Sequence, residues 1–434
     1  MRILVRGGRV VDPATGTDGV LDVLIDGPRI ARVGPGPAAA ADRTIDAAGL
    51  VVVPGLIDMH VHLREPGHEA KETIATGARA AVRGGFATVC AMPNTDPVTD
   101  GPETIAWILA EARRVGLAHV YPIASVTRGS RGLDLVDMAA CVAAGAVAFS
   151  DDGRPVSTSA IMRRALTEAA AAGALIIDHC EDRDLAAGGV MHEGRASARL
   201  GLPGIPSASE EVVVARDLAL AEELGVAAHI AHLSTAGGVG LLAEAKRRGA
   251  RVSAEATPHH LFLTDEDVRA DDADFKMNPP LRSAADAAAL VEGVRSGVVD
   301  VIATDHAPHT PAEKARGFRE APFGVVGLET AVPLVLDRLV SPGLITLGRF
   351  VELLATNPAR LLGLAAKGRI EAGADADLTL LDPARTVTID KDRFESKGRN
   401  TPFDSWTLRG GPVMTIVGGR VAYPFEGAGP SRQP

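Results

Sequence analysis

Short apolar runs alternate with longer segments rich in alanine, leucine, arginine and glutamate through the middle of the chain. The apolar runs predict strands at Val52–Asp58, Ala87–Met92, Val120–Val126, Ala146–Ser150, Leu175–Asp178, Ala227–Ala231, Val252–Ala256 and Val301–Thr304. The segments between them predict helices, among them Glu103–Val115, Thr158–Ala172, Ser209–Leu224, Gly240–Arg248 and Ala284–Ser296. Strands that alternate with helices in this way predict a (β/α)8 barrel, whose active-site groups project from the C-terminal strand ends.

Both ends of the chain carry short β-type runs separated by glycine, proline and aspartate, which is typical of a small antiparallel sheet. These runs are Ile3–Val5, Arg9–Val11, Val20–Ile25 and Ile30–Val33 at one end, and Leu378–Leu381, Thr386–Ile389 and Val413–Val417 at the other. Neither end is long enough to make a good core alone. We therefore expect residues 1–53 and 365–434 to form one small β-sandwich domain beside a barrel of residues 54–364.

Side chains that bind metals stand directly after four of the apolar runs. His60 and His62 lie on the same side of an extended segment, because side chains alternate along a strand. His179, His232 and Asp305 follow three later runs. A lone His-x-His pair is as often an ordinary polar strand end, but five such groups at equivalent places fit a metal site better than coincidence. Imidazoles with a carboxylate are the ligands expected for zinc or a similar divalent ion.

The distribution of these groups bears on both the fold and the number of metals. A doubly wound open sheet, the competing architecture, would gather its ligand at one switch point, whereas several strand ends contribute here. Four imidazoles and one carboxylate exceed the needs of one tetrahedral zinc ion, which favours two ions and a bridging anion. Asp151 and Asp152 follow the fourth run and suit that role, although Asp-Asp-Gly also suits a plain turn.

Composition excludes several classes of function. The chain has 434 residues, 46% of them hydrophobic and 23% charged, as in ordinary globular proteins. A net charge of −10 and an aromatic content of 3% argue against nucleic acid or an anionic membrane as a partner. No window approaches the roughly 18 apolar residues of a membrane helix. Three separated cysteines without a CxxC pair indicate a reducing cytoplasm.

Specific motifs add a resemblance to this picture. They are Pro54–Gly67 (PGLIDMHVHLREPG), Ala91–Thr95 (AMPNT), Ala256–Leu261 (ATPHHL), Lys276–Arg282 (KMNPPLR), Ala303–His309 (ATDHAPH) and Ala321–Gly324 (APFG). With them the chain resembles the amidohydrolase superfamily and, within it, the bacterial dihydroorotases. The likeness extends to Pro412–Arg420 and so covers nearly the whole chain.

The resemblance implies an activity. Dihydroorotases reversibly cyclise N-carbamoyl-L-aspartate to L-dihydroorotate, the third step of pyrimidine nucleotide synthesis. The implied mechanism uses a hydroxide shared by two zinc ions per subunit, with Asp305 as the general acid and base.

The resemblance also implies a set of site residues. The expected metal ligands are His60, His62, Asp152, His179, His232 and Asp305. Many relatives bridge their metals with a carboxylated lysine, but this chain has no lysine between Lys71 and Lys246. Asp152 is expected to bridge instead, because its spacing to His179 resembles that of Asp-bridged members.

The expected substrate contacts come from several motifs. They are His62, Arg64, Asn94, Asn278, His309, Phe323 and Gly324. Arg64 would bind the substrate carboxylate bidentately. The alternative for Arg64 is a surface ion pair with Glu65 or Glu69, and Asn94 could be a turn residue.

Other functions stay open at this point. Another cyclic amidase, a hydantoinase or an allantoinase, is the first alternative, and Arg64, Asn94 and the missing lysine favour dihydroorotase over it. A non-catalytic scaffold partner of aspartate transcarbamoylase is the second, although every expected ligand is present. A complex with that transferase and a homodimer are both compatible with catalysis. The polar stretch Thr310–Glu320 is expected to be a mobile lid or a solvated loop.

Overall fold

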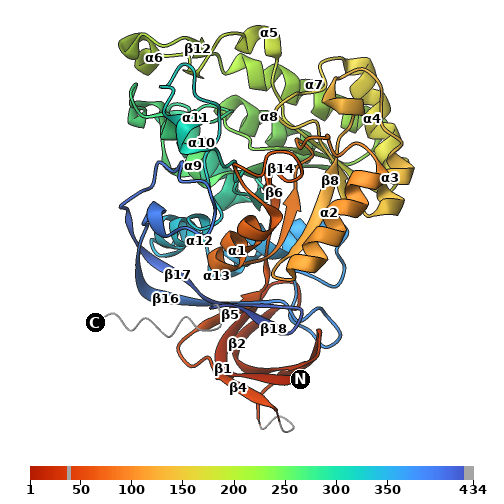
Figure 1. Cartoon of the computed structure of the whole chain (residues 1–434), viewed down its shortest axis with the longest axis vertical. Coiled ribbons are helices and arrows are strands. Elements are labelled where there is room, and N and C mark those ends of the chain that lie inside the picture. The colour runs from red at the N-terminus through yellow and green to blue at the C-terminus, as the bar shows by residue number, and fades with distance from the viewer. Residues whose placement is uncertain (37–40, 425–434) are drawn as a thin grey trace.

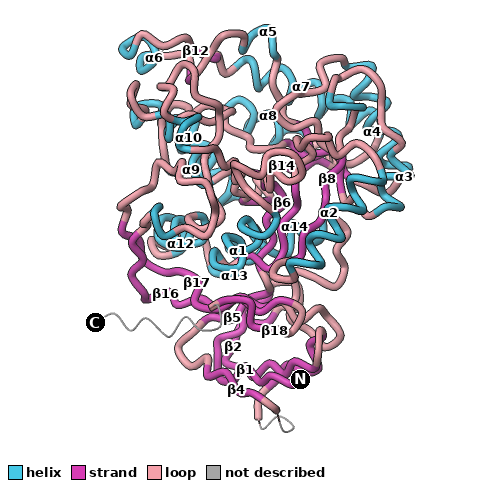
Figure 2. Tube along the Cα trace, viewed as in Figure 1, coloured by secondary structure: helices cyan, strands magenta, loops and turns pink. Residues whose placement is uncertain are grey.

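Parallel strands form a barrel in the computed structural model, which describes residues 1–36 and 41–424 (Figures 1 and 2). In this part of the chain the barrel strands are β6 (Leu56–Val61), β7 (Phe86–Ala91), β8 (His119–Ala124), β9 (Ala148–Phe149), β10 (Leu175–Asp178), β13 (Ala228–Ile230), β14 (Val252–Ala256) and β15 (Val301–Ile302). Each pairs in parallel with the next, and a bridge between Val61 and His306 joins the last segment to the first. The predicted barrel is therefore confirmed over the open sheet.

Helices surround the barrel strands, as Figure 2 shows. The longer ones are α1 (Ile74–Gly84), α2 (Pro102–Val115), α3 (Met138–Ala144), α4 (Ser159–Ala171), α7 (Ala208–Leu224), α8 (Ala236–Arg247) and α10 (Ala284–Ser296). Shorter helical segments are α5 (Arg183–Ala186), α6 (Arg195–Leu200), α9 (Pro258–Phe262), α11 (Pro311–Lys314), α12 (Ala331–Val335), η4 (Leu336–Val340), α13 (Leu347–Val351), η5 (Glu352–Thr356) and α14 (Asn357–Leu361).

Hydroxyl side chains set where several of these helices begin. Thr158 caps α4, Thr235 caps α8 and Ser283 caps α10, each by accepting a hydrogen bond from a backbone N–H in the first turn. In the described part of the chain, no helix is long and apolar enough to cross a lipid bilayer.

The first predicted strand, Val52–Asp58, is wrong as a single element. It is two strands, because β5 (Val51–Pro54) pairs with the terminal sheet and only β6 belongs to the barrel. Gly55 separates them, and a Cβ there would lie 2.6 Å from Ala87 Cβ and 2.7 Å from Asp377 Cβ. The apolar run is continuous because both strands are buried, so hydrophobicity alone does not reveal the change of sheet.

The two ends of the chain pair in one sheet at the end of the molecule where the barrel strands begin (Figure 1). Within the described residues its strands are β1 (Arg2–Asp12), β2 (Thr17–Asp26), β3 (Arg29–Gly34), β4 (Arg43–Asp46), β5, β16 (Leu378–Thr388), β17 (Thr407–Val417) and β18 (Arg420–Tyr423). They enclose a core of their own that includes Val10, Val23, Leu378 and Ile416. Residues 425–434 of the expected small domain lie outside the described residues.

Asp377 connects this sheet to the base of the barrel. Its carboxylate accepts hydrogen bonds from Lys367 Nζ at 2.7 Å and from Gly418 N at 2.7 Å, and it lies 3.1 Å from His119 Nε2. Burial opposes ionisation, but His119 and Lys367 outweigh it and hold the pKa of Asp377 at about 2.

We expect Asp377→Asn to lower the free energy of unfolding at pH 7 by about 2 kcal/mol, from the difference between this pKa and the ordinary value. The folded-state pKa is depressed, so the contribution is complete above the unfolded-state pKa and is lost as the pH falls toward about 2. Urea unfolding from pH 7 down to the lowest pH at which both proteins fold measures it. Asp18→Asn, which removes an exposed pair with Arg9, should change stability little. A pH-independent difference would contradict the prediction.

Candidate metal centre and its surroundings

Six side chains meet at the C-terminal ends of the barrel strands. They are His60, His62, Asp152, His179, His232 and Asp305, all buried. Asp152 lies in their middle: its Oδ1 is 3.4 Å from the Nε2 atoms of His60 and His232 and 3.5 Å from His179 Nδ1. Its Oδ2 is 3.5 Å from His62 Nε2. The fold thus brings one carboxylate among four imidazoles that are far apart in sequence.

Asp305 completes the cluster from the loop after β15. Its Oδ1 lies 3.0 Å from His62 Nε2 and 3.5 Å from His60 Nε2. The backbone of Asp305 has a φ of 47° and that of His232 a φ of 30°, a region that non-glycine residues rarely occupy. Such strain persists only where the surrounding structure holds the residue in place, and it aims both side chains inward.

The cluster fits a bound cation. His60 Nε2 and Asp152 Oδ1 are buried and have no hydrogen-bond partner, which is exceptional for buried polar atoms. The ligand atoms of His60, His62 and Asp305 lie within 4.8 Å of one another, as do those of His60, Asp152 and His232. Imidazole nitrogens and carboxylate oxygens at this spacing suit zinc or a similar divalent ion.

The electrostatics of the cluster favour positive charge at its centre. Burial opposes ionisation of Asp152, but the charge of His60 and the close approach of His179 and His232 hold its pKa well below the ordinary value. Against the same opposing effect of burial, His60 and His62 hold the pKa of Asp305 at about 2. Both carboxylates are therefore ionised at neutral pH.

Asp151 occupies a different environment from its neighbour. Its carboxylate accepts hydrogen bonds from Ser125 Oγ at 2.7 Å and Val126 N at 2.9 Å, and from both the N–H and the hydroxyl of Thr127. These bonds tie it to the loop after β8. Asp152, whose Oδ1 has no such donor, is the aspartate that faces the imidazoles.

Glu255 supports the cluster, although it is not among the site residues predicted from the sequence. Its Oε1 lies 2.5 Å from His60 Nδ1 and accepts a hydrogen bond from His232 N at 3.2 Å. Its Oε2 is 3.3 Å from His229 Nε2. A carboxylate that holds the far nitrogen of a histidine fixes the ring orientation and tautomer. The signal was a single acid inside the otherwise apolar or small-residue strand β14.

Arg64 and His309 lie beside the cluster and touch each other. Arg64 Nη2 is 3.4 Å from His309 Nε2, and Arg64 Nε donates to Pro308 O at 3.3 Å. His309 Nε2 in turn lies 2.8 Å from Phe323 O. In the described part of the chain no carboxylate forms an ion pair with Arg64, because Glu65 accepts from Ile74 N and Glu69 from Gly67 N. The surface-pair alternative for Arg64 is therefore not what the structure contains.

The two asparagines contact the ligand cluster directly. Asn94 Oδ1 lies 2.7 Å from His62 Nδ1, and Asn94 Nδ2 donates to Asp152 Oδ2 at 3.5 Å. Asn278 Nδ2 donates to Glu181 Oε1 at 2.9 Å and lies 3.4 Å from His179 Nε2. The buried Oδ1 of Asn278 has no hydrogen-bond partner, so one acceptor is available at the edge of the cluster.

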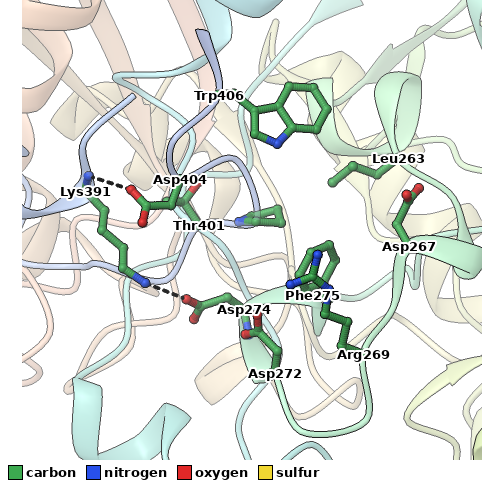
Figure 3. A pocket seen from close by; sticks show the side chains of 11 residues that line it. Leu263, Asp267, Arg269, Asp272, Asp274, Phe275, Lys391, Thr401, Asp404 and Trp406 are labelled. Atoms are coloured by element: carbon green, nitrogen blue, oxygen red, sulfur yellow. Dashed lines mark hydrogen bonds and ion pairs between the residues drawn. The ribbon is translucent and has the colours of Figure 1, made fainter. Parts of the chain in front are cut away.

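A separate cavity of about 310 Å³ lies between the loop before Phe275 and the segment that precedes β17 (Figure 3). Its lining includes Asp274, Lys391, Thr401 and Trp406, and none of the six clustered residues. Lys391 Nζ donates to Asp274 at 3.5 Å across it. The cavity is therefore distinct from the candidate site.

Comparisons with known proteins agree on the type of protein. A family profile described as "Dihydro-orotase-like" matches residues 49–237. A protein named Dihydroorotase from Pelotomaculum thermopropionicum is 56% identical over 421 residues, covering 97% of this chain and 98% of the relative. Another of that name, from Syntrophus aciditrophicus, is 49% identical and covers 98% of this chain and 99% of its own length.

Solved structures support the fold. An L-hydantoinase (dihydropyrimidinase) from Arthrobacter aurescens has a TM-score of 0.88 and 28% identity, covering 96% of this chain and 95% of its own. A dihydropyrimidinase from Brevibacillus agri NCHU1002 has a TM-score of 0.83 at 24% identity, with coverage of 97% and 95%. The second likeness shows the architecture alone.

Proposed function

The chain belongs to the dihydroorotase family of cyclic amide hydrolases, and we propose that its site interconverts N-carbamoyl-L-aspartate and L-dihydroorotate in pyrimidine nucleotide synthesis. The observation that carries the substrate assignment is the guanidinium of Arg64, which lies next to the ligand cluster without a carboxylate partner among the described residues. A half-buried cation of this kind suits a carboxylate-bearing substrate.

We propose that His60, His62, Asp152, His179, His232 and Asp305 hold two zinc ions, with Asp152 between them. The unpartnered atoms of His60 and Asp152 and the two overlapping groups of ligand atoms support this assignment. When bound, zinc lowers the pKa of water and polarises a carbonyl oxygen, which is the chemistry that amide hydrolysis needs.

Other side chains and backbone groups of the site bind the substrate. Arg64, with Asn94 and His309 beside it, binds and orients the substrate carboxylate. Asn278 and the backbone at Phe323 and Gly324 contact the ring.

Asp305 moves the proton. In ring opening, the ionised Asp305 takes the proton of the attacking water and delivers it to the ring nitrogen as the C–N bond breaks. In ring closure, the same carboxylate removes the proton from the carbamoyl nitrogen as it attacks the carboxyl carbon, and it returns that proton to the departing hydroxyl oxygen, so that the C–N bond forms, a C–O bond breaks and water leaves. The distance of 3.0 Å between Asp305 Oδ1 and His62 Nε2 supports this role, because it puts the carboxylate beside a proposed metal ligand.

A parallel assay with dihydroorotate, hydantoin and allantoin tests the proposed substrate. We expect turnover of dihydroorotate to exceed that of the other two by a wide margin. Preferred turnover of hydantoin would favour the activity named for the solved structures. No turnover of any of the three by metal-loaded protein would favour a scaffold role beside aspartate transcarbamoylase.

Arg64→Ala is expected to raise the KM for dihydroorotate about 10- to 100-fold, the range for loss of a charged hydrogen-bonding partner, with a smaller effect on kcat. Steady-state kinetics measure both constants. Arg64→Lys serves as the matched variant: it retains the charge but loses the planar fork, so it should recover only part of the affinity. A KM that stays unaltered in Arg64→Ala would remove the carboxylate assignment.

We also propose that the enzyme acts in the cytoplasm, as a homodimer or in a complex with aspartate transcarbamoylase. Size-exclusion chromatography with light scattering, with and without the transferase, distinguishes these assemblies.

A further inference from the structure

The carbonyl oxygen of Gly324 is held by two side chains from opposite parts of the chain. Lys314 Nζ, from α11, donates to it at 2.9 Å, and Asn400 Nδ2, from the segment before β17, donates at 3.0 Å. The N–H of Gly324 donates to Lys276 O at 2.9 Å. The backbone N–H and C=O of Gly324 are therefore both hydrogen-bonded. These bonds fix the orientation of the Phe323–Gly324 turn.

Asn400 joins this turn to the loop that carries His309. Its Nδ2 also donates to Ala307 O at 3.0 Å, and its Oδ1 accepts from His309 N at 3.2 Å. Its backbone oxygen accepts from Val326 N at 2.9 Å. Asn400 is 3% exposed, so water does not compete for these bonds. One buried amide thus sets the distance between the two backbone segments that flank the proposed substrate.

Lys314 donates hydrogen bonds to the Phe323–Gly324 turn from the side opposite Asn400. Besides Gly324 O, its Nζ contacts Lys276 O at 3.3 Å and Pro322 O at 3.2 Å. In the described part of the chain the Lys314 ammonium group forms no ion pair, and Lys314 as a whole is 9% exposed. Burying an ammonium group without a carboxylate is costly, and burial lowers the pKa of Lys314 to about 8. This cost is offset by the three carbonyl oxygens of Lys276, Pro322 and Gly324.

Close packing leaves the turn little freedom to shift. A Cβ on Gly324 would lie 2.8 Å from both the Cβ and the backbone oxygen of Ala307. On the neighbouring segment, a Cβ on Gly398 would lie 2.6 Å from Val326 Cγ1 and 2.8 Å from Pro308 Cβ. The segment that carries Asn400 therefore sits directly against the loops of Pro308 and Val326, and its other side lines the cavity of Figure 3.

We propose that Asn400 and Lys314 are positioning residues that hold His309 and the Phe323–Gly324 turn in the geometry that binds the substrate. The inference rests on the proposed function, because the substrate contacts of that loop and turn belong to it. Neither side chain contacts the six clustered residues, so they act on substrate affinity through the backbone. The 310–320 stretch, expected to be a lid or a solvated loop, is anchored here by Lys314.

The test substitutes Asn400 and Lys314 one at a time and leaves the six clustered residues unchanged. Asn400→Asp keeps the acceptor for His309 N but places a carboxylate oxygen against the carbonyls of Ala307 and Gly324. Lys314→Met keeps the chain length and removes the three donated bonds. Thr401→Val is the matched control for Asn400: it is the next residue, equally buried, and its hydroxyl accepts only from Phe403 N at 3.3 Å. Lys391→Met, on the far cavity, is the control for Lys314.

We expect both test variants to raise the KM for dihydroorotate at least tenfold, to change kcat less than KM, and to retain wild-type metal content. Hydrogen exchange should accelerate in peptides covering 307–309 and 322–326, and the controls should resemble the wild type in every measurement. An unchanged KM, or a fall in kcat alone, in folded variants would overturn the inference.

If Asn400→Asp does not fold, Lys314→Met decides the question. If neither folds while both controls do, the residues are structural and the inference is wrong. Wild-type protein that fails to turn over dihydroorotate would instead refute the proposed function, and the exchange measurement would still report whether the two side chains hold the loops.

Discussion

Asp305→Ala is expected to lower kcat for dihydroorotate by about a thousandfold, within the range for loss of a general acid and base. The structure explains why one residue carries this effect: Asp305 is ionised, buried, and held in a strained backbone conformation beside His60 and His62. Among the described residues Asp152 also lies close to both imidazoles, but it contacts His179 and His232 as well, which suits the proposed bridging position. Steady-state kinetics in both reaction directions, together with metal analysis, measure the effect.

The control for this prediction is Asp305→Asn, which retains the shape and the contact to His62 but cannot take up a proton. It should be nearly as inactive as Asp305→Ala. Metal content should remain largely intact in both variants, because the other five ligands persist. Unchanged turnover in either variant would remove the proton-transfer role, and complete loss of metal would assign the effect to metal binding instead.

Asp152→Ala is expected to have the second large effect, the loss of bound metal and with it nearly all turnover. Asp152 is the one carboxylate that contacts all four imidazoles of the described cluster, so its removal leaves them without the charge between them. We expect the metal content to fall from about two equivalents of zinc per chain to one or fewer. The histidines that remain could at most hold one ion in a single tetrahedral site. Elemental analysis of purified protein measures this directly.

The neighbouring aspartate offers a matched control. Asp151→Asn removes the negative charge from three hydrogen bonds, from Ser125 Oγ, Val126 N and Thr127 N, and replaces the oxygen that accepts from the Thr127 hydroxyl with a donor, but it leaves the imidazoles untouched. It should destabilise folding by about 1–3 kcal/mol and keep its metal. A variant pair with the opposite behaviour, metal lost with Asp151 and kept with Asp152, would contradict the assignment of the bridge.

The amino-acid sequence by itself determined the barrel and the types of ligand in the candidate site. The spacing of hydrophobic residues that indicates a strand or a helix is a local property of the sequence. The alternating strands and helices can therefore be predicted without knowing which residues contact one another. Five of the proposed ligands can be found for the same reason, because each follows an apolar run, whereas the choice of Asp152 over Asp151 came from the family resemblance. The motifs Pro54–Gly67 and Ala303–His309 indicated the dihydroorotase family, and the similarity to relatives of that name supports this assignment.

Only the tertiary structure decided how these parts meet. It divided the run around Gly55 between two sheets, because the close approach of Ala87 and Asp377 is invisible in a hydrophobic pattern. It separated Asp152 from Asp151, which are chemically identical and differ only in which donors surround them. It also revealed Glu255 and Asn400, whose partners lie far away along the chain: Glu255 binds His60 from 195 positions away, and Asn400 binds Ala307 from 93. Hydrogen bonds between distant segments depend on how the whole chain closes, so no local pattern encodes them.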